Sequence, residues 1–290
     1  QTGLNFSRSE GLAIASLRLF ESGVLSQSGL DDPLRVDAAS LQALTPEILA
    51  MEFQVSQSNQ LLGLEDRAKL LNRLGDTLLK QKHIFEAEGT FRPGNLFDYL
   101  TRSQVNGVLK ARDILIAVLQ GMGEIWPDGS WIDNVAIGDA GYHEVVKRSD
   151  ITDGIVPFHK LSQWMSYSLI EPLQEAGFKV NNLDALTGLA EYRNGGLFID
   201  TKAISLKDRT QLEVVHDPKS PLVVEWRALT VVLLDKLAEK IRRSTNTDSG
   251  SMPLASILQG GTWSAGRRIA QQLRANGVPP LQLNSRGTIF

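Results

Sequence analysis

Two carboxylates, Glu191 and Asp200, lie in a segment that begins at Leu186 and also holds Tyr192 and Arg193 between apolar residues. Hydrolysis of a glycosidic bond passes through a transition state with oxocarbenium character. A carboxylate beside that centre stabilises the positive charge and orients or deprotonates the attacking water. The segment is therefore a candidate for such chemistry. A structural interpretation stays open, in which Arg193 pairs with a nearby acid and Asp200 caps a turn.

A second candidate lies just upstream, in the helix expected after Pro157. At about 100° per residue, one stripe of this helix, roughly 60° wide, carries a cation, two aromatic rings and a carboxylate: Lys160, Trp164, Tyr167 and Glu171. Such a stripe suits the lining of a pocket that stacks a planar group. A separate arc is apolar and is expected to face the core: Leu161, Met165, Leu169 and Leu173. The alternative is that the first stripe is simply a solvated face.

Two later clusters add candidates. Glu225, Trp226 and Arg227 fall in the first turns of an apolar helix, where a buried Glu225 would need a partner such as Arg227 or Lys160. Trp263 lies in the segment Gly261 to Arg267 that leads into the last predicted helix, whose N-terminus could bind an anion. A structural role is at least as well supported for both clusters.

Metal and nucleotide sites are not expected. The chain has no cysteine, and its histidines, His83, His143, His159 and His216, show no ligand-pair spacing. There is no P-loop, no dinucleotide-binding glycine motif and no nucleophile elbow of a serine hydrolase. The pairs Gly195-Gly196 and Gly260-Gly261 are interpreted as turns that allow positive φ. The sequence thus predicts chemistry without a metal or cofactor.

The composition of the chain limits the kinds of ligand that it is expected to bind. The chain has 290 residues, 42% hydrophobic, with a formal net charge of −3. A small neutral or polar ligand suits this balance better than a nucleic acid, which normally meets a basic face. No run of about 18 apolar residues predicts a membrane span, and we expect a cytoplasmic protein. The first residue is Gln1, so we expect further native sequence before it; the oligomeric state stays open.

Helical patterns dominate the chain and predict a mainly α fold with a few short strands. Helices are expected over about 7–23, 45–51, 61–79, 104–120, 220–243 and 265–275, several with cap or proline signals at their starts. Strands are expected over 134–137, 144–147, 196–199 and 281–283. The prediction is one helical domain over residues 1–290, or two helical lobes around a cleft.

Several blocks of the sequence resemble the uracil-catabolism protein family, over a span from Arg8 to Phe290. The blocks that carry the resemblance are Arg8-Ser9-Glu10-Gly11-Leu12, Arg35-Val36-Asp37-Ala38, Val156 to Trp164, Glu191 to Gly196, Val224 to Thr230 and Gly261-Thr262-Trp263. The resemblance implies a role in a pyrimidine-degradation pathway of fungi and bacteria that passes through a ribosylated urea.

A weaker similarity concerns the queuosine salvage glycosidases, through Phe158 to Gln163, Leu186-Thr187 and Glu191-Tyr192-Arg193. It implies a helical fold related to DNA glycosylases and cleavage of an N-ribosidic bond without a metal. The chain departs from that pattern in two places. Glu191 stands where those enzymes have an aspartate, and Asn194-Gly195-Gly196 replaces their Val-Pro-Gln, which suggests a different substrate.

Together the two resemblances imply a hydrolase that cleaves ribosylurea, or its phosphate, to ribose and urea. Glu191 or Asp200 is then the catalytic carboxylate. The expected substrate-binding residues are His159, Lys160, Trp164, Tyr192, Arg193, Glu225, Trp226 and Trp263. Two alternatives stay open: an amidohydrolase that acts on a ureido group, and a non-catalytic ligand-binding subunit of the same pathway.

Overall fold

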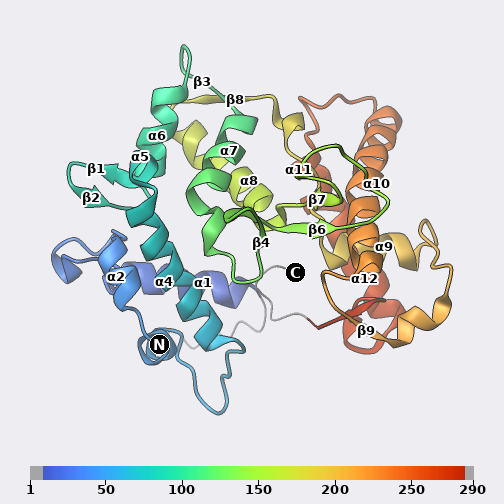
Figure 1. Ribbon diagram of the computed structural model, residues 1–290, viewed down its shortest axis with the longest axis horizontal. Helices are drawn as coiled ribbons and strands as arrows, with labels where there is room; N and C mark the ends of the chain where they lie inside the picture. The colour runs from blue at the N-terminus through green and yellow to red at the C-terminus, as the bar shows by residue number, and fades with distance from the viewer. Residues whose placement is uncertain (1–8, 285–290) are drawn as a thin grey trace. The chain divides into compact units, whose positions relative to one another are not determined.

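The structure is a computed structural model that describes residues 9–284. The chain divides into two compact units. The first unit consists of residues 1–102 and 120–127, and the second consists of residues 103–119 and 128–290. The mainly helical prediction is confirmed, and the strands form only two-stranded pairs (Figure 1).

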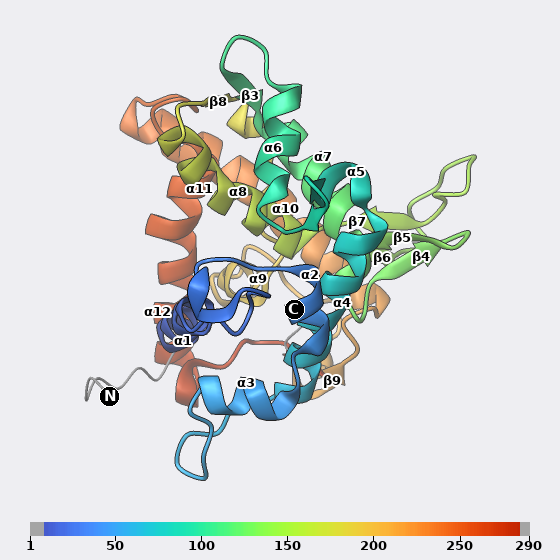
Figure 2. The same ribbon diagram turned by 90° about the vertical axis from the view of Figure 1, so that its left-hand side faces the viewer.

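The first unit is a group of helices with one small hairpin. Its elements are α1 (Ser9–Glu21), α2 (Ala38–Ala43), α3 (Pro46–Glu52), α4 (Leu64–Lys80), α5 (Lys82–Phe85), β1 (Glu86–Ala87), β2 (Thr90–Phe91) and α6 (Asn95–Ser103). Figure 2 shows α2 against α4. Gly75 of α4 allows this approach, because a Cβ there would lie 2.7 Å from the carbonyl oxygen of Ala38.

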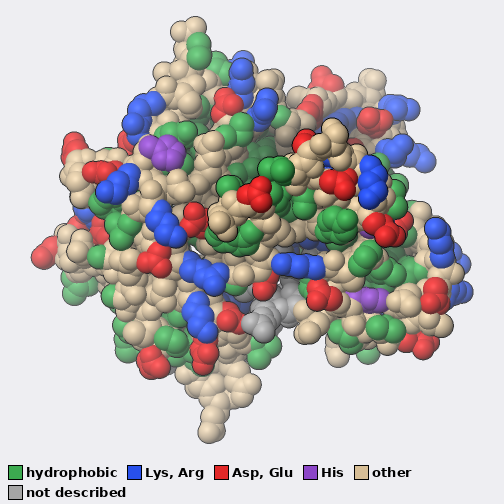
Figure 3. All heavy atoms as spheres, in the orientation of Figure 1, with side chains coloured by type: hydrophobic (Ala, Val, Ile, Leu, Met, Phe, Trp, Pro, Cys, Tyr) green, Lys and Arg blue, Asp and Glu red, His purple; other side chains and the backbone are tan. Residues whose placement is uncertain are grey.

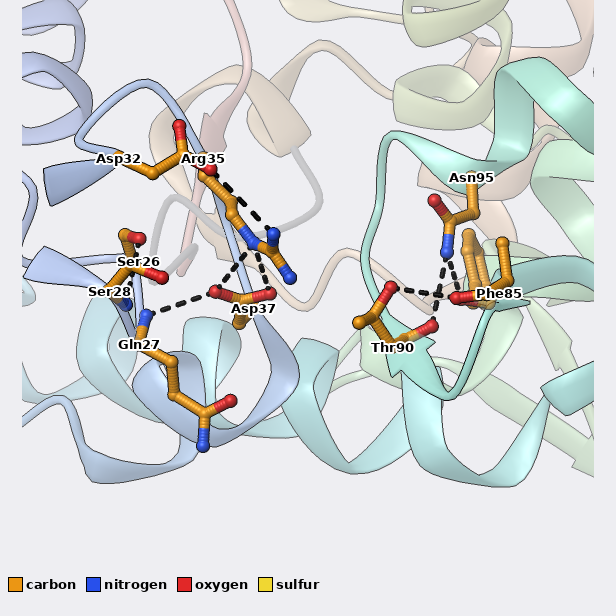
Figure 4. Close-up of polar contacts among 10 residues, drawn as sticks. Ser26, Gln27, Ser28, Asp32, Arg35, Asp37, Phe85, Thr90 and Asn95 are labelled. Carbon is orange, nitrogen blue, oxygen red and sulfur yellow. Dashed lines mark hydrogen bonds and ion pairs between the residues drawn. The ribbon is translucent and has the colours of Figure 1, made fainter.

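Hydrogen bonds of polar side chains fix the loops of the first unit (Figure 4). Arg35 donates from Nε to both carboxylate oxygens of Asp37, at 2.9 and 3.1 Å, and Asp37 Oδ2 also accepts from the amide of Gln27. Asn95 donates to the carbonyl oxygens of Phe85 and Thr90 and so closes the β1–β2 hairpin. The block Arg35 to Ala38 therefore holds a loop in place before α2.

The second unit combines long helices with short strands. Its elements are β3 (Val108–Lys110), α7 (Ala111–Met122, whose last turn belongs to the first unit), β4 (Ser130–Ile132), β5 (Val135–Gly138), β6 (Ala140–Tyr142), β7 (Ile155–Pro157), α8 (Lys160–Glu175), β8 (Lys179–Asn181), α9 (Tyr192–Asp200), β9 (Val215–His216), α10 (Pro221–Thr245), α11 (Leu254–Ile257), α12 (Trp263–Leu273) and β10 (Gln282–Leu283). β4–β5 and β6–β7 are antiparallel, whereas β3–β8 and β9–β10 are parallel.

The core of the second unit forms where α9 packs against α10 and α12 (Figure 1). Glycines bring these helices together. A Cβ on Gly195 would lie 2.7 Å from the ring of Trp226 in α10, and one on Gly266 of α12 would lie 2.4 Å from the carbonyl oxygen of Arg193. Phe198 and Leu234 anchor the apolar cluster on the other side of the α9–α10 contact.

The helices predicted over 45–51, 61–79 and 220–243 are found as α3, α4 and α10, and the strands predicted over 134–137 and 281–283 as β5 and β10. Thr45 caps α3 as expected, since its hydroxyl accepts from the amide of Ile48. The predicted cap at Ser7 lies outside the described residues. No helix within residues 9–284 has the length and apolarity needed to cross a membrane.

Three predictions about secondary structure are wrong. Residues 196–199 belong to α9 and residues 144–147 to a loop, while the helix expected from 104 begins only at Ala111, after β3. The interpretation of the glycine pairs as turns is also wrong. Gly195 and Gly196 lie inside α9 and Gly260 and Gly261 in a π-helical turn, Leu258–Thr262, and none of the four has a positive φ.

Candidate active site

Glu191 is the N-cap of α9 and is held at both oxygens. Its Oε1 accepts from the amide of Asn194 and its Oε2 from the amide of Arg193, each at 2.6 Å. The first amides of a helix have no partner within the helix, and the helix dipole favours a negative charge beside them. Only 7% of Glu191 is exposed. The sequence therefore places a fixed, buried carboxylate at the start of α9.

Burial is the main influence on the proton affinity of Glu191. Loss of water raises the pKa of Glu191 above its usual value, although the two amides and the charge of Lys160 act in the opposite direction. A carboxyl group that binds its proton more tightly than usual is suited to proton transfer near neutral pH. The structural and chemical interpretations of Glu191 are thus compatible, because the cap also fixes the orientation of the group.

Lys160, the first residue of α8, belongs to the same charged cluster. It is 7% exposed, and burial, reinforced by the charge of Arg227, lowers the pKa of Lys160 to about 8. The charges of Glu191 and Asp139 partly oppose this shift. The starts of α8 and α9, which are 32 residues apart in the chain, are therefore brought close enough for their side chains to interact electrostatically.

An ion pair that the sequence did not predict is in contact with the backbone at Lys160 and just before Glu191. The guanidinium of Arg227 in α10 donates to both carboxylate oxygens of Asp139, at 2.8 and 2.7 Å, and lies 4.0 Å above the ring of Phe158. Asp139 connects β5 to β6, and both charged side chains are almost fully buried. The sequence offered Arg227 or Lys160 as the partner of a buried Glu225, but Glu225 is exposed and Arg227 pairs with Asp139 instead.

Two polar atoms around this cluster are buried and have no hydrogen-bond partner among the described residues. They are Nδ1 of His159 and Oδ1 of Asn194. Burial, together with the charge of Arg227, lowers the pKa of His159, while Asp139 opposes the shift, so the imidazole is neutral around pH 7. Buried polar atoms are normally paired, and an unpaired one at a candidate site suits a ligand atom.

Asp200, the other predicted catalytic carboxylate, lies at the opposite end of α9. Its two oxygens accept from the guanidinium of Arg274 at 2.7 and 2.6 Å, and its side chain is buried. Nine helical residues span about 13 Å along the axis, which exceeds the separation of two carboxyl groups that act on one glycosidic bond. Glu191 and Asp200 are therefore not brought together as a catalytic pair.

The stripe predicted on α8 does not line one pocket. Lys160 is buried, but Trp164 is 49% exposed and Glu171 is also exposed. Tyr167 lies between these extremes and donates from its hydroxyl to the carbonyl oxygen of Thr187. The buried face of the first turns is polar instead of apolar, with Lys160, Ser162, Gln163 and Ser166. Of the arc expected to face the core, only Leu173 is buried.

The other predicted binding residues near α9 are engaged with neighbouring groups. Arg193 donates to the carbonyl oxygen of Gly277 at 2.9 Å, and its guanidinium lies 5.0 Å from the centre of the Tyr192 ring. Trp263 begins α12 and stacks with Arg267 at 4.7 Å. The structure therefore gives each of these residues a packing role.

Glu225 and Trp226 lie at a separate cavity of about 380 Å³ in the second unit. Its walls are mainly apolar, from Leu222, Leu229, Ile199, Ile204 and Leu281, and its polar members include His143, Lys207 and Asp208. Glu191 and Lys160 are not among its lining residues. Trp226 contributes to this wall and also packs against Gly195, two residues after the amide of Arg193 that binds Glu191.

Within residues 9–284, no three side chains of the His, Cys, Asp or Glu types are grouped as metal ligands would be. The polar groups that are brought together are a lysine, a histidine, an arginine and two carboxylates: Lys160, His159, Arg227, Asp139 and Glu191. Asp139 is paired with Arg227, and Glu191 is fixed by the amides of Arg193 and Asn194. Such a set can stabilise a cation beside Glu191, transfer a proton and hold hydroxyl groups.

The sequence as a whole belongs to a known family of proteins. The chain belongs to the family described as a protein of unknown function (DUF1688), whose model matches residues 1–290. It is 38% identical over 312 residues to Uracil catabolism protein 4 of Lachancea kluyveri, covering 98% of this chain and 70% of that protein. It is also 40% identical over 292 residues to Protein urg3 of Schizosaccharomyces pombe, covering 98% and 68% of the two chains. The family resemblance seen in the sequence blocks is confirmed.

Proposed function

We propose that this protein is a hydrolase of uracil catabolism that cleaves the N-ribosidic C–N bond of ribosylurea, or of its phosphate, to ribose and urea. The observation that carries the proposal is the buried carboxylate of Glu191, fixed by two helix amides beside Lys160. The relative from Lachancea kluyveri, Uracil catabolism protein 4, supports the pathway by its name. A helical fold related to DNA glycosylases is part of the same proposal.

The chemistry needs little from the protein. As the C1′–N bond breaks, positive charge develops on the ribose ring, and the fixed carboxylate stabilises it. The oxygen of a water molecule bonds to C1′, and Glu191 accepts a proton from that water. The departing urea nitrogen takes up the proton, so that the reaction consumes one water and leaves the enzyme unchanged. The raised pKa makes Glu191 a stronger base toward the attacking water, and the more basic leaving nitrogen then receives the proton.

The remaining polar atoms suit the two halves of the substrate. Urea is rich in N–H groups, and the unpaired Oδ1 of Asn194 is an acceptor at the helix start that Glu191 caps. Nδ1 of neutral His159 and the ammonium group of Lys160 are suited to ribose hydroxyl groups or to a phosphate.

The test uses the substitution Glu191→Gln and an assay of free urea released from ribosylurea and from its phosphate. We expect release to fall by at least 10²-fold, in the range seen when a group that stabilises transition-state charge is removed. The melting temperature stays near that of the wild type, since a glutamine oxygen can still accept from one of the two amides. Thr45→Ala is a matched control, because it removes a helix cap in the first unit and leaves urea release unchanged.

Full activity of Glu191→Gln would overturn the assignment of the carboxylate. Tight binding of ribosylurea by the wild type without any release of urea would instead favour the non-catalytic ligand-binding subunit. Release of ammonia or carbamate from the ureido group, with the ribosidic bond intact, would favour the amidohydrolase.

A further inference from the structure

We propose that the buried Asp139–Arg227 pair is the positioning element of this site, which fixes the backbone of α8 and α9 at the points where they carry His159, Lys160 and Glu191. The inference rests on the proposed function and deepens it. Asp139 and Arg227 are proposed to act through their neighbours, whose backbone they hold.

Asp139 holds the start of α8. His159, the N-cap residue of α8, is in the left-handed region at φ 49° and makes no side-chain cap. The missing cap comes from Asp139, whose Oδ2 accepts from the amide of Lys160 at 3.0 Å. The carbonyl oxygen of Asp139 also accepts from the amides of Phe158 and His159, at 3.0 and 2.9 Å. One residue thus binds three successive amides and sets the direction of the His159 and Lys160 side chains.

Arg227 holds the approach to α9. Its Nε donates to the carbonyl oxygen of Ala190 at 3.3 Å, directly before Glu191, while its two terminal nitrogens bind Asp139. Its face stacks on the ring of Phe158 at 4.0 Å, directly before His159. The planar guanidinium therefore connects both site segments through one rigid group, which a lysine could not do.

Stability alone does not account for this arrangement. Replacing a buried ion pair by well-packed apolar residues is often neutral or stabilising, so a buried pair is weak evidence for a stabilising role. A positioning role predicts, in addition to any effect on stability, an effect on the pKa of Lys160. The pair places one cation and one anion close to Lys160, and the two charges act on the pKa of Lys160 in opposite directions: Arg227 lowers it and Asp139 raises it. Glu191 also acts on Lys160 and raises this pKa.

The experiment follows the titration of Lys160 by NMR in protein with ¹³C-labelled lysine, with the Lys160 signal assigned by its loss in Lys160→Arg. Arg227→Gln is expected to move the midpoint upward and Asp139→Asn to move it downward, each by about one pH unit. The control Arg274→Gln breaks another bidentate pair of the second unit, the partly buried one with Asp200, and is expected to leave the midpoint unchanged. Because no substrate is present, the titration is independent of whether the protein is a ribosylurea hydrolase.

Kinetics provide the second measurement. Both single variants, and Arg227→Lys, are expected to lose about ten- to hundredfold in kcat, as a misplacement of about 1 Å would cause, with a smaller change in KM. The double variant Asp139→Asn/Arg227→Gln leaves no unpaired buried charge and serves if a single variant does not fold. Its midpoint returns toward the wild-type value while its kcat stays low.

An unchanged Lys160 midpoint in both single variants would overturn the proposal. So would variants that lose only melting temperature, as Arg274→Gln does, with kcat intact. The wild type could release no urea while the Lys160 midpoint still rises in Arg227→Gln and falls in Asp139→Asn. That result would overturn the proposed reaction and retain the positioning of Lys160.

Discussion

At the scale of residues, burial moves the pKa values of Glu191 and Lys160 toward each other. Water is removed from both groups, which disfavours both charged forms, so the pKa of Glu191 rises and that of Lys160 falls to about 8. Each charge partly stabilises the other. The pair is therefore ionised only within a window of pH that is narrower than for a glutamate and a lysine in water.

The window predicts the pH dependence of urea release. Glu191 must be ionised to stabilise the ribose cation, so activity falls as the pH decreases through its raised pKa. Lys160 must be protonated to hold the substrate, so activity falls again as the pH rises through about 8. A profile of kcat/KM from pH 5 to 10 should be bell-shaped, with its alkaline limb near 8.

The variant Lys160→Arg tests whether Lys160 causes the alkaline limb of this pH profile. An arginine stays protonated throughout this range, so the alkaline limb should move beyond pH 10 while the acid limb stays close to its original position. The overall rate falls, because a guanidinium does not reproduce the compact ammonium group. An alkaline limb that stays near pH 8 in this variant would assign it to another group.

The sequence revealed Glu191 and Lys160 but not the residues that organise them. Asp139 and Arg227 are 88 positions apart, and no local pattern connects a carboxylate between two short strands with a cation in an apolar helix. The sequence did not predict the buried polar face of α8 either, because its partners are also distant in the chain. Gln163, for example, is buried because its oxygen accepts from the amide of Thr187, 24 positions later.

At the scale of elements, predictions succeeded where the start signal of a helix is local and failed where tertiary contacts decide. Thr45-Pro46 and Ser220-Pro221 mark the starts of α3 and α10 correctly. In α9, the glycine pair and the apolar run after it suggested a turn followed by a strand. The segment is helical because Glu191 satisfies its first amides and because α10 and α12 pack against its glycines.

The α9–α10 contact predicts a large effect of one added methyl group. In Gly195→Ala, the new Cβ would meet the Trp226 ring at 2.7 Å and the Thr230 hydroxyl at 2.8 Å, so the helices must separate. We expect the free energy of unfolding to fall by about 1–3 kcal/mol, as for other overpacked cores. Urea release should fall as well, since Glu191 caps the same helix.

Gly260→Ala is the matched control for that measurement. No atom lies within 4 Å of a Cβ built on Gly260, and the residue is exposed without a positive φ. Its effect on the unfolding free energy should stay within about 0.5 kcal/mol. Equal stability of the two variants in denaturant titrations would show that α9 and α10 are not held as closely as described.

At the scale of the whole molecule, charge and organisation both favour a small ligand. The chain carries 30 basic and 33 acidic residues, and on the face drawn in Figure 3 acidic side chains lie among the basic ones. The groups proposed to act on the substrate, Glu191, Lys160, His159 and Asn194, all belong to the second unit. The Arg35–Asp37 contact of the first unit holds a loop and takes no part in the proposed chemistry (Figure 4).

The proposed site makes the stability of the protein depend on its substrate. A ligand that binds only the folded state stabilises it by RT ln(1 + [L]/Kd), about 2.7 kcal/mol at a hundredfold excess over Kd. For a protein of this size that corresponds to roughly 4–5 °C in melting temperature. Glu191→Gln is the suitable variant for this experiment, because it keeps the surrounding groups and does not consume the ligand. We therefore expect ribosylurea to raise its melting temperature by about this amount, and ribose or urea alone to raise it much less.

Asn194→Ala, made in the Glu191→Gln background, tests which part of the substrate is recognised. Removing the buried Oδ1 should abolish most of the stabilisation by ribosylurea and leave that by ribose unchanged, because only the urea half needs an acceptor there. The ligand-free melting temperature of each variant serves as its own reference. If Asn194→Ala reduces the stabilisation by ribosylurea and by ribose equally, Asn194 has a purely structural role. If ribosylurea at millimolar concentration does not stabilise Glu191→Gln at all, binding at this site is contradicted.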